Sequence, residues 1–225
     1  MHRITKILLS VGLSVGISTA AMSQQIELAT PTVGSRFEYL WSYGGRDTFT
    51  IVGTNGGRLQ ARLEQDFEDD GVIDEIGLQY WDLNSRLWLA HVGLSYATIY
   101  APSTDAQMPT ALFDGLYFSG TFDLMTIDDL TTLFSTWSQV ISSCDYLRSK
   151  EMAETPTGLF STLEIACTDN DVSPGSTITD DPVPSYQYSE LWSLELGMPV
   201  VQSFGIDQST GEAEDFSLLV AYSLN

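Results

Sequence analysis

Residues 36–52, RFEYLWSYGGRDTFTIV, decide the fold class of this chain. Every second residue in the first half is aromatic and most of the others are polar, a period of two that is typical of a half-buried β-strand. Gly44–Gly45 then offers a turn into the apolar run Thr48–Val52. The stretch therefore predicts two antiparallel strands, and the first carries these aromatic residues on one face: Phe37, Tyr39, Trp41 and Tyr43.

The same period continues along the chain between turn signals. Asn55–Gly56–Gly57 and Asp70–Gly71 are typical of hairpin turns, and alternating runs follow both of them. Leu87–Tyr100 predicts one long strand that Pro102 ends. Turn signals every 8–12 residues or so indicate an antiparallel meander. We therefore expect a mainly β fold, an antiparallel half-barrel or barrel-like meander with one short helix.

The predicted helix covers about residues 127–138. Thr126 and Asp129 have the spacing of a capping box at its start. The apolar residues that follow recur at three- and four-residue intervals, which favours a helix: Ile127, Leu130, Leu133 or Phe134, Trp137, and Val140 or Ile141.

Residues 1–23 predict a secretory signal peptide. Arg3 and Lys6 precede an apolar run at 7–17, and small residues follow it. Cleavage is expected after Ala20 or, preferably, after Ser23. The run is shorter than the ~20 residues that span a bilayer. The expected product is one β-rich domain, residues 24–225, that is periplasmic or secreted and has no membrane span.

Composition excludes two classes of partner. The chain has 225 residues, with 30 acidic and 9 basic side chains and a formal net charge of −21. Nucleic-acid affinity depends on Lys and Arg side chains that release counterions, so a nucleic-acid partner is not expected. The same charge disfavours docking on an anionic membrane surface.

Cys144 and Cys167 predict one disulfide, because an even pair of cysteines in an exported protein is most often bridged. A hairpin folded about Thr155–Pro156 sets the two opposite each other, since both lie about 11 residues from its centre. The rival interpretation, a reactive thiol, requires basic neighbours. Arg148 and Lys150 are the ones available nearby.

Three features of the C-terminal half form a pattern: Trp137 followed by Cys144, TPTGLFSTLEIAC at 155–167, and YSELWSLELGMPVV at 188–201. This pattern resembles that of a family of periplasmic β half-barrel proteins of unknown function, similar to the lipoprotein-localisation carriers. Thr157 and Leu194 depart from the family pattern, where Ala and Pro are common. The resemblance implies a curved sheet around an apolar groove that binds acyl chains or a protein partner.

Aromatic residues are the candidate lining of such a groove. The alternative is that they simply fill the core. Trp81 and Tyr100 belong to the same group. The predicted groove residues are Trp41, Tyr80, Trp88, Tyr96, Trp137 and Trp192.

An acidic segment follows the first part of a calcium-binding loop. Acidic residues stand at its positions 1, 3, 5 and 9, and Gly71 stands at position 6, where such loops turn sharply. Gly77 replaces the bidentate Glu at position 12, and the flanking segments predict strands. Calcium is therefore a possible ligand, with a plain Asp-Gly turn as the alternative; no other cofactor is expected. The candidate ligands are Asp66, Glu68, Asp70 and Asp74.

Catalytic motifs are scarce. After residue 23 the sequence has one histidine, His91, and no Gly-x-Ser-x-Gly elbow. A transition-metal site would need several His or Cys ligands. We therefore expect a non-catalytic protein that binds an apolar ligand or a protein partner. A calcium-stabilised binding or adhesion module is the first alternative. A hydrolase that uses a pair of carboxylates is the second.

Overall fold

The computed structural model describes residues 24–225, apart from 105, 131, 133, 150–151, 173–185, 208–209 and 211. The predicted signal peptide, residues 1–23, lies outside the described residues.

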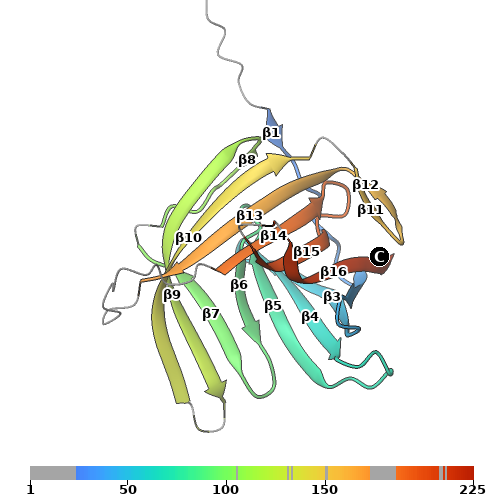
Figure 1. Ribbon diagram of the computed structural model, residues 1–225, viewed down its shortest axis with the longest axis horizontal. Coiled ribbons are helices and arrows are strands. Elements are labelled where there is room, and N and C mark those ends of the chain that lie inside the picture. The colour runs from blue at the N-terminus through green and yellow to red at the C-terminus, as the bar shows by residue number, and fades with distance from the viewer. Residues whose placement is uncertain are drawn as a thin grey trace, which may run out of the picture.

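Twelve antiparallel strands form one closed barrel (Figure 1). Each strand pairs with the barrel strands before and after it along the chain, and the last pairs with the first, so the barrel is a simple meander. The predicted β fold is confirmed, and the barrel-like form is the one adopted rather than the half-barrel. The strands are β2 (Arg36–Trp41), β3 (Arg46–Asn55), β4 (Arg58–Asp66), β5 (Glu75–Asp82), β6 (Trp88–Val92), β7 (Ala97–Pro102), β9 (Leu116–Asp129), β10 (Phe134–Arg148), β13 (Thr162–Asp171), β14 (Tyr186–Ser193), β15 (Pro199–Ile206) and β16 (Ala213–Ser223).

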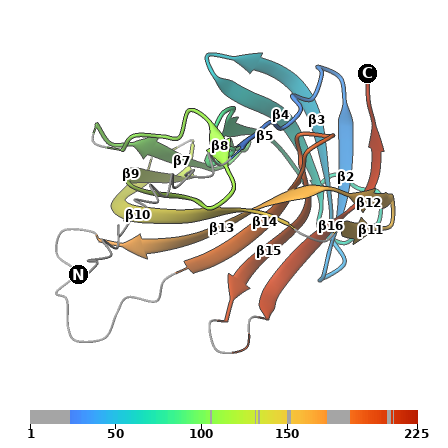
Figure 2. The same ribbon diagram turned by 90° about the horizontal axis from the view of Figure 1, so that it is seen from above.

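Two small sheets accompany the barrel. Strand β1 (Gln25–Ile26) pairs with β8 (Leu112–Phe113). Strands β11 (Ala153–Thr155) and β12 (Gly158–Phe160) form a short hairpin against β15 and β16, as Figure 2 also shows.

The predicted helix at 127–138 is wrong, and the described part of the chain contains no helix. Ile127–Asp129 end β9, and the residues from Phe134 onward begin β10. Thr126 pairs with both Thr98 and Thr136. Threonine, serine and aromatic residues dominate the segment, and they favour strands over helices. Trp137 is 65% exposed, so the apolar spacing did not mark a face that packs on a core.

The predicted long strand at 87–100 is two strands. β6 ends at Val92, Gly93 to Tyr96 form a turn closed by the Gly93 N–H bond to the Tyr96 carbonyl, and β7 begins at Ala97. Both strands are rich in apolar residues, which concealed the turn between them.

The disulfide prediction is confirmed. Cys144 on β10 and Cys167 on β13 are direct cross-strand partners, and their sulfurs are bonded. The chain between them turns at Thr155–Gly158, next to the predicted centre. Both cysteines are buried in the barrel core.

One end of the barrel is packed solid. Its core includes Trp81, Trp192 and Tyr146, all almost fully buried. The turn between β5 and β6 fills this closed end, because the Tyr146 hydroxyl donates to the Ser85 carbonyl and the Arg86 Nη2 donates to the Ala29 carbonyl.

Residues 24–35, the N-terminal strap, run along the closed end. The Ala29 N–H donates to the Leu194 carbonyl, and the Gly34 N–H donates to the Ile51 carbonyl. A Cβ on Gly197, whose φ is +65°, would overlap the Ala29 carbonyl oxygen. Glycine at 197 therefore permits both the turn and the close approach of the strap.

Candidate functional site

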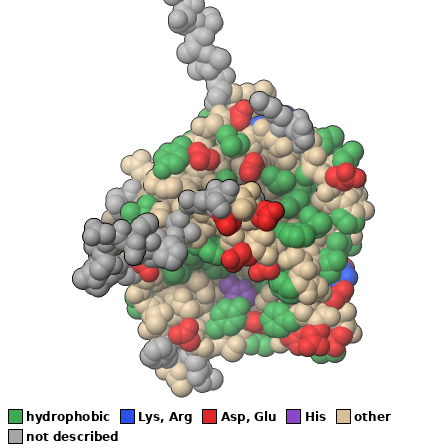
Figure 3. Space-filling view, in the orientation of Figure 1, with side chains coloured by type: hydrophobic (Ala, Val, Ile, Leu, Met, Phe, Trp, Pro, Cys, Tyr) green, Lys and Arg blue, Asp and Glu red, His purple; other side chains and the backbone are tan. Residues whose placement is uncertain are grey.

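The barrel holds a cavity of about 360 Å³ above the packed end. Aromatic side chains from seven strands point into it: Trp41 (β2), Phe49 (β3), Trp81 (β5), Trp88 (β6), Tyr100 (β7), Phe122 (β9), and Tyr186 and Tyr188 (β14). Tyr96 and Phe204 extend this lining. In Figure 3 a hollow on this face has histidine and acidic side chains at its surface.

Strand alternation explains which residues reach the cavity. On β14 every second side chain points inward, from Tyr186 through Tyr188 to Glu190, and Trp192 continues the row into the core. On β3 the same rule brings Asp47 and Phe49 inside.

Four aromatic rings form a continuous row on one wall. The centroids of Trp41 and Phe204 are 5.6 Å apart, those of Phe204 and Tyr188 are 6.3 Å apart, and those of Tyr188 and Tyr186 are also 6.3 Å apart. On another wall Trp88 and Tyr100 meet edge to face at 5.1 Å. The cavity therefore offers flat apolar faces on more than one side.

Glu190 is a buried carboxyl in the cavity wall. Its Oε2 accepts from the Trp192 indole at 2.9 Å, and its Oε1 accepts from the Gln202 amide at 2.8 Å. Ser217 donates in turn to Gln202. Burial raises the pKa of Glu190, although these two hydrogen bonds oppose the rise.

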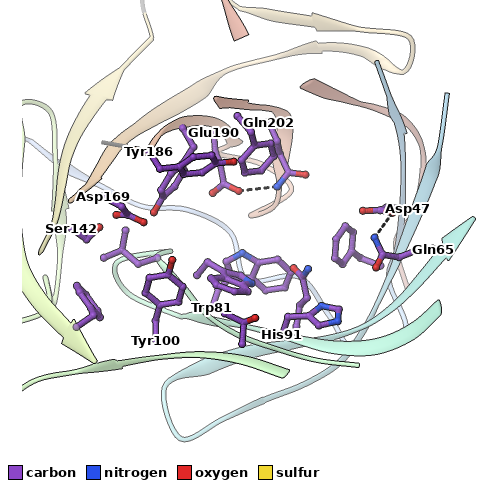
Figure 4. A pocket seen from close by; sticks show the side chains of 18 of the residues that line it. Asp47, Gln65, Trp81, His91, Tyr100, Ser142, Asp169, Tyr186, Glu190 and Gln202 are labelled. Atoms are coloured by element: carbon purple, nitrogen blue, oxygen red, sulfur yellow. Dashed lines mark hydrogen bonds between the residues drawn. The ribbon is translucent and has the colours of Figure 1, made fainter. Parts of the chain in front are cut away.

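Asp47 and Asp169 are the two other carboxyls of the lining (Figure 4). Burial raises the pKa of each. The Gln65 amide donates to Asp47 at 3.1 Å, whereas Oδ1 of Asp169 has no hydrogen-bond partner among the described residues. Ser142 is the cross-strand neighbour of Asp169 on β10 and lowers its pKa through a side-chain hydrogen bond.

His91 is the basic group of the lining and is only 5% exposed. Its Nε2 lies 3.5 Å from Glu75 Oε1, and its ring stacks on Tyr96 with centroids 4.9 Å apart. Burial lowers the pKa of His91, and the neighbouring Glu75 carboxylate only partly opposes this. A neutral imidazole follows at pH 7, so the lining has three carboxyls and no permanent cation among its described residues.

The predicted groove residues are divided by the structure. Trp41, Trp88 and Tyr96 line the cavity. Trp192 lies in the core beside it. Tyr80 points out of the barrel, where the Gln60 amide donates to its hydroxyl, and Trp137 is exposed.

The predicted calcium segment forms the turn between β4 and β5. Asp66 is buried, and its carboxylate accepts the backbone N–H groups of Asp70 and Gly71 at 3.1 and 2.7 Å. Asp74 accepts the Phe67 N–H, and Glu68 is exposed. No group of three or more His, Cys, Asp or Glu side chains within the described ranges is arranged to hold a metal ion. Calcium binding stays a prediction.

The polar part of the cavity was not among the residues predicted from the sequence. Alternation could have found two of its members, because Asp47 shares a strand face with Phe49, and Glu190 shares one with Trp192. Nothing in the local sequence distinguishes Asp169 from the other acidic residues.

Fold and cavity together define a class: a closed antiparallel barrel with a mixed aromatic and acidic interior. No family model matches the chain, and no curated protein matches it. Its structure is similar to a candidate lipoprotein from Parabacteroides distasonis, with 12% identity, a TM-score of 0.49, and coverage of 89% of this chain and 100% of that one. It is also similar to the hypothetical lipoprotein YmcC from Escherichia coli, with 12% identity, a TM-score of 0.45, and 85% of each chain covered.

None of the described residues forms a helix that is long and apolar enough to cross a membrane. The disulfide agrees with folding in an oxidising compartment.

Proposed function

We propose that this is an exported, non-catalytic binding protein that holds a small and largely apolar ligand inside the barrel. The observation that carries the proposal is the cavity of about 360 Å³ between aromatic walls. Cavities of about 300 to 1,000 Å³ with apolar linings and a few polar groups are typical of small-molecule sites. The predicted signal peptide and the disulfide support a periplasmic or secreted location.

Two measurements test the proposal on the full chain exported to a bacterial periplasm. Native mass spectrometry would detect a bound small molecule that organic solvent releases. Titration with N-phenyl-1-naphthylamine, a neutral apolar fluorophore, would measure binding to the emptied protein. We expect a saturable rise in fluorescence with one site per chain.

A pair of neighbouring variants places the site. Ser142 is buried and lines the cavity, whereas Ser143 faces outward and contacts Ser119. Ser142→Phe is expected to fill the cavity and abolish fluorophore binding, and Ser143→Phe is expected to leave it unchanged. Equal binding by both variants, or none by the unaltered protein, contradicts the proposal and favours the other predicted occupant, a protein partner at another surface.

A hydrolase is the second candidate, because Asp47, Asp169 and Glu190 share the cavity and burial raises the pKa of each. A carboxyl with a raised pKa can act as a general acid beside an ionised partner. Hydrolysis of nitrophenyl glycosides that disappears in both Asp169→Asn and Glu190→Gln would establish this function in place of simple binding.

A further inference from the structure

We propose that the ligand carries a positively charged amine or quaternary ammonium group, which Asp169 binds beside the rings of Tyr100, Tyr186 and Tyr188. This inference rests on the proposed binding function and names the chemical class of the ligand.

The first argument is the balance of charge in the cavity. Three carboxyls line it, and His91 is its one titratable base among the described lining residues. The buried guanidinium of Arg86 lies over the ring of Trp192 at the closed end. Neither residue lines the cavity. Burying carboxylates without a cation costs free energy, and a cationic ligand would offset that cost on binding.

The second argument distinguishes Asp169 from the other two carboxyls. Glu190 is held by Trp192 and Gln202, and Asp47 is held by Gln65. Asp169 alone of the three keeps a buried oxygen with no hydrogen-bond partner among the described residues. That oxygen can therefore accept a charge-assisted hydrogen bond from a protonated amine, or attract a quaternary ammonium group by charge alone.

The third argument is the arrangement of rings around Asp169. Tyr186 is its direct cross-strand partner on β14, and Tyr188 follows on the same inward face. Tyr100 approaches from β7; Figure 4 shows Asp169 with Tyr186 and Tyr100 near it. Burial raises the pKa of all three tyrosines, and the Asp169 charge adds to the rise, so their phenols stay neutral.

Neutral tyrosine rings attract cations through the negative potential of their faces. A carboxylate with aromatic rings around it therefore stabilises an ammonium group both by charge attraction and by cation–π contacts. The stacked rings of Trp41 and Phe204 remain available for the apolar part of the ligand. An anionic ligand such as a free fatty acid would meet three carboxyls instead, so the cavity disfavours it.

Three probes with the same chain and different head-group charges test the inference: decyltrimethylammonium, decanol and decanoate. Each would displace N-phenyl-1-naphthylamine from the full chain, below its micelle-forming concentration and in 0.15 M salt, where surface attraction is screened. Decyltrimethylammonium is expected to bind about tenfold more tightly than decanol, and decanoate is expected to bind most weakly.

Asp169→Asn removes the charge attraction to the trimethylammonium group, so it is expected to weaken decyltrimethylammonium binding by about tenfold and to leave decanol binding unchanged. Asp145→Asn is the matched control, because Asp145 lies on the outer face of the neighbouring strand β10 and is exposed. It removes the same charge from the surface and should change neither affinity.

The outcomes distinguish the inference of a cationic ligand from the proposed binding function. Equal or tighter binding of decanol overturns the cationic ligand and leaves the binding protein intact. A cation preference that Asp169→Asn does not reduce overturns the assignment to this carboxylate. Failure of every probe to bind overturns the proposed function and the inference together.

Discussion

The guanidinium carbon of Arg86 lies 5.6 Å from the centre of the Trp192 ring at the closed end of the barrel. On its cavity side, Trp192 donates its indole N–H to Glu190, which lines the cavity. One tryptophan thus stands between a buried cation and a buried carboxyl. Burial lowers the pKa of Arg86 to about 10, which still leaves it charged.

Arg86→Ala is expected to lower the free energy of unfolding by about 2–4 kcal/mol. The variant loses the hydrogen bond to Ala29 and the contact with Trp192, and it leaves a void. Urea denaturation measures the change. Arg58→Ala, at an exposed arginine, is the control; a similar effect of both variants would contradict a structural role for Arg86.

Gly197→Ala is expected to destabilise the protein and to loosen the N-terminal strap. A Cβ at 197 would overlap the Ala29 carbonyl oxygen. Gly56 has a similar φ, +61° against +65°, with open space around it, so Gly56→Ala carries the backbone strain without the clash. Thermal melting and limited proteolysis of residues 24–35 should show a larger effect at 197. Equal effects would mean that backbone strain alone matters.

Mild acidification is expected to change stability in opposite directions through two kinds of group. The folded pKa of Glu190 is above its ordinary value of 4.5, so between the two values the folded protein holds a proton that the unfolded chain releases. Proton uptake by Glu190 therefore raises the free energy of unfolding as the pH falls through its folded pKa. The rise ends near pH 4.5, where the unfolded chain takes up the same proton. His91 acts oppositely below pH 6.5, because its folded pKa is lowered.

The variant Glu190→Gln shows how much of this pH dependence comes from the Glu190 carboxyl. Relative to the unaltered protein, the free energy of unfolding of the variant is expected to be highest at pH 8 and to fall as the pH falls toward 4.5. The amide has one acceptor oxygen where the carboxylate uses two, so a loss of hydrogen bonding adds a constant to this difference. Urea denaturation across this range measures it. A difference that does not vary with pH would show that hydrogen bonding, not ionisation, determines the effect.

Removing the disulfide with the double variant Cys144→Ala and Cys167→Ala is expected to cost about 3 kcal/mol. The bridge spans 23 residues, and a cross-link of that length restricts the unfolded chain by roughly this amount. Denaturation with and without a reducing agent is the measurement. The reductant should destabilise the unaltered protein and have no effect on the double variant.

Asp66→Ala is expected to lower the free energy of unfolding by about 1–3 kcal/mol, because two backbone N–H groups lose their acceptor. Glu68→Ala, at an exposed neighbour, should be near neutral. Melting with calcium and with EDTA tests the calcium prediction in the same samples. A melting temperature that rises with calcium only when Asp66 is present would support a metal site in this turn.

The sequence was sufficient for the fold class and the disulfide, because both depend on local patterns. Aromatic alternation from Phe37 to Trp41 marks the inner face of β2, and the turn near Thr155–Pro156 sets the register of the two cysteines. The helix failed because a three- and four-residue apolar spacing also arises by chance across a hairpin turn, as it does around Trp137.

The inner face of β5 shows why the site was harder to predict. Both faces of this strand carry large side chains, with Tyr80 on one and Trp81 on the other, so alternation defines two faces without saying which one is inside. Barrel closure decides that Trp81 and Gln79 face the cavity. Asp169 and Glu190 lie on the paired strands β13 and β14, whereas Asp47 lies far from both in the sequence and joins them only through that closure.

Pairing of β2 with β16 has a consequence for the order of folding. Thr32 Oγ1 donates to the carbonyl of Asn225, 193 residues away, and neighbouring pairs join Arg36 to Ser223. The first barrel strand to be made therefore keeps an unpaired edge until the last strand is available. Contacts of such long sequence separation form slowly, and a sheet with open edges can recruit other chains. The nascent protein is therefore most vulnerable to aggregation just before β2 and β16 pair and the barrel closes.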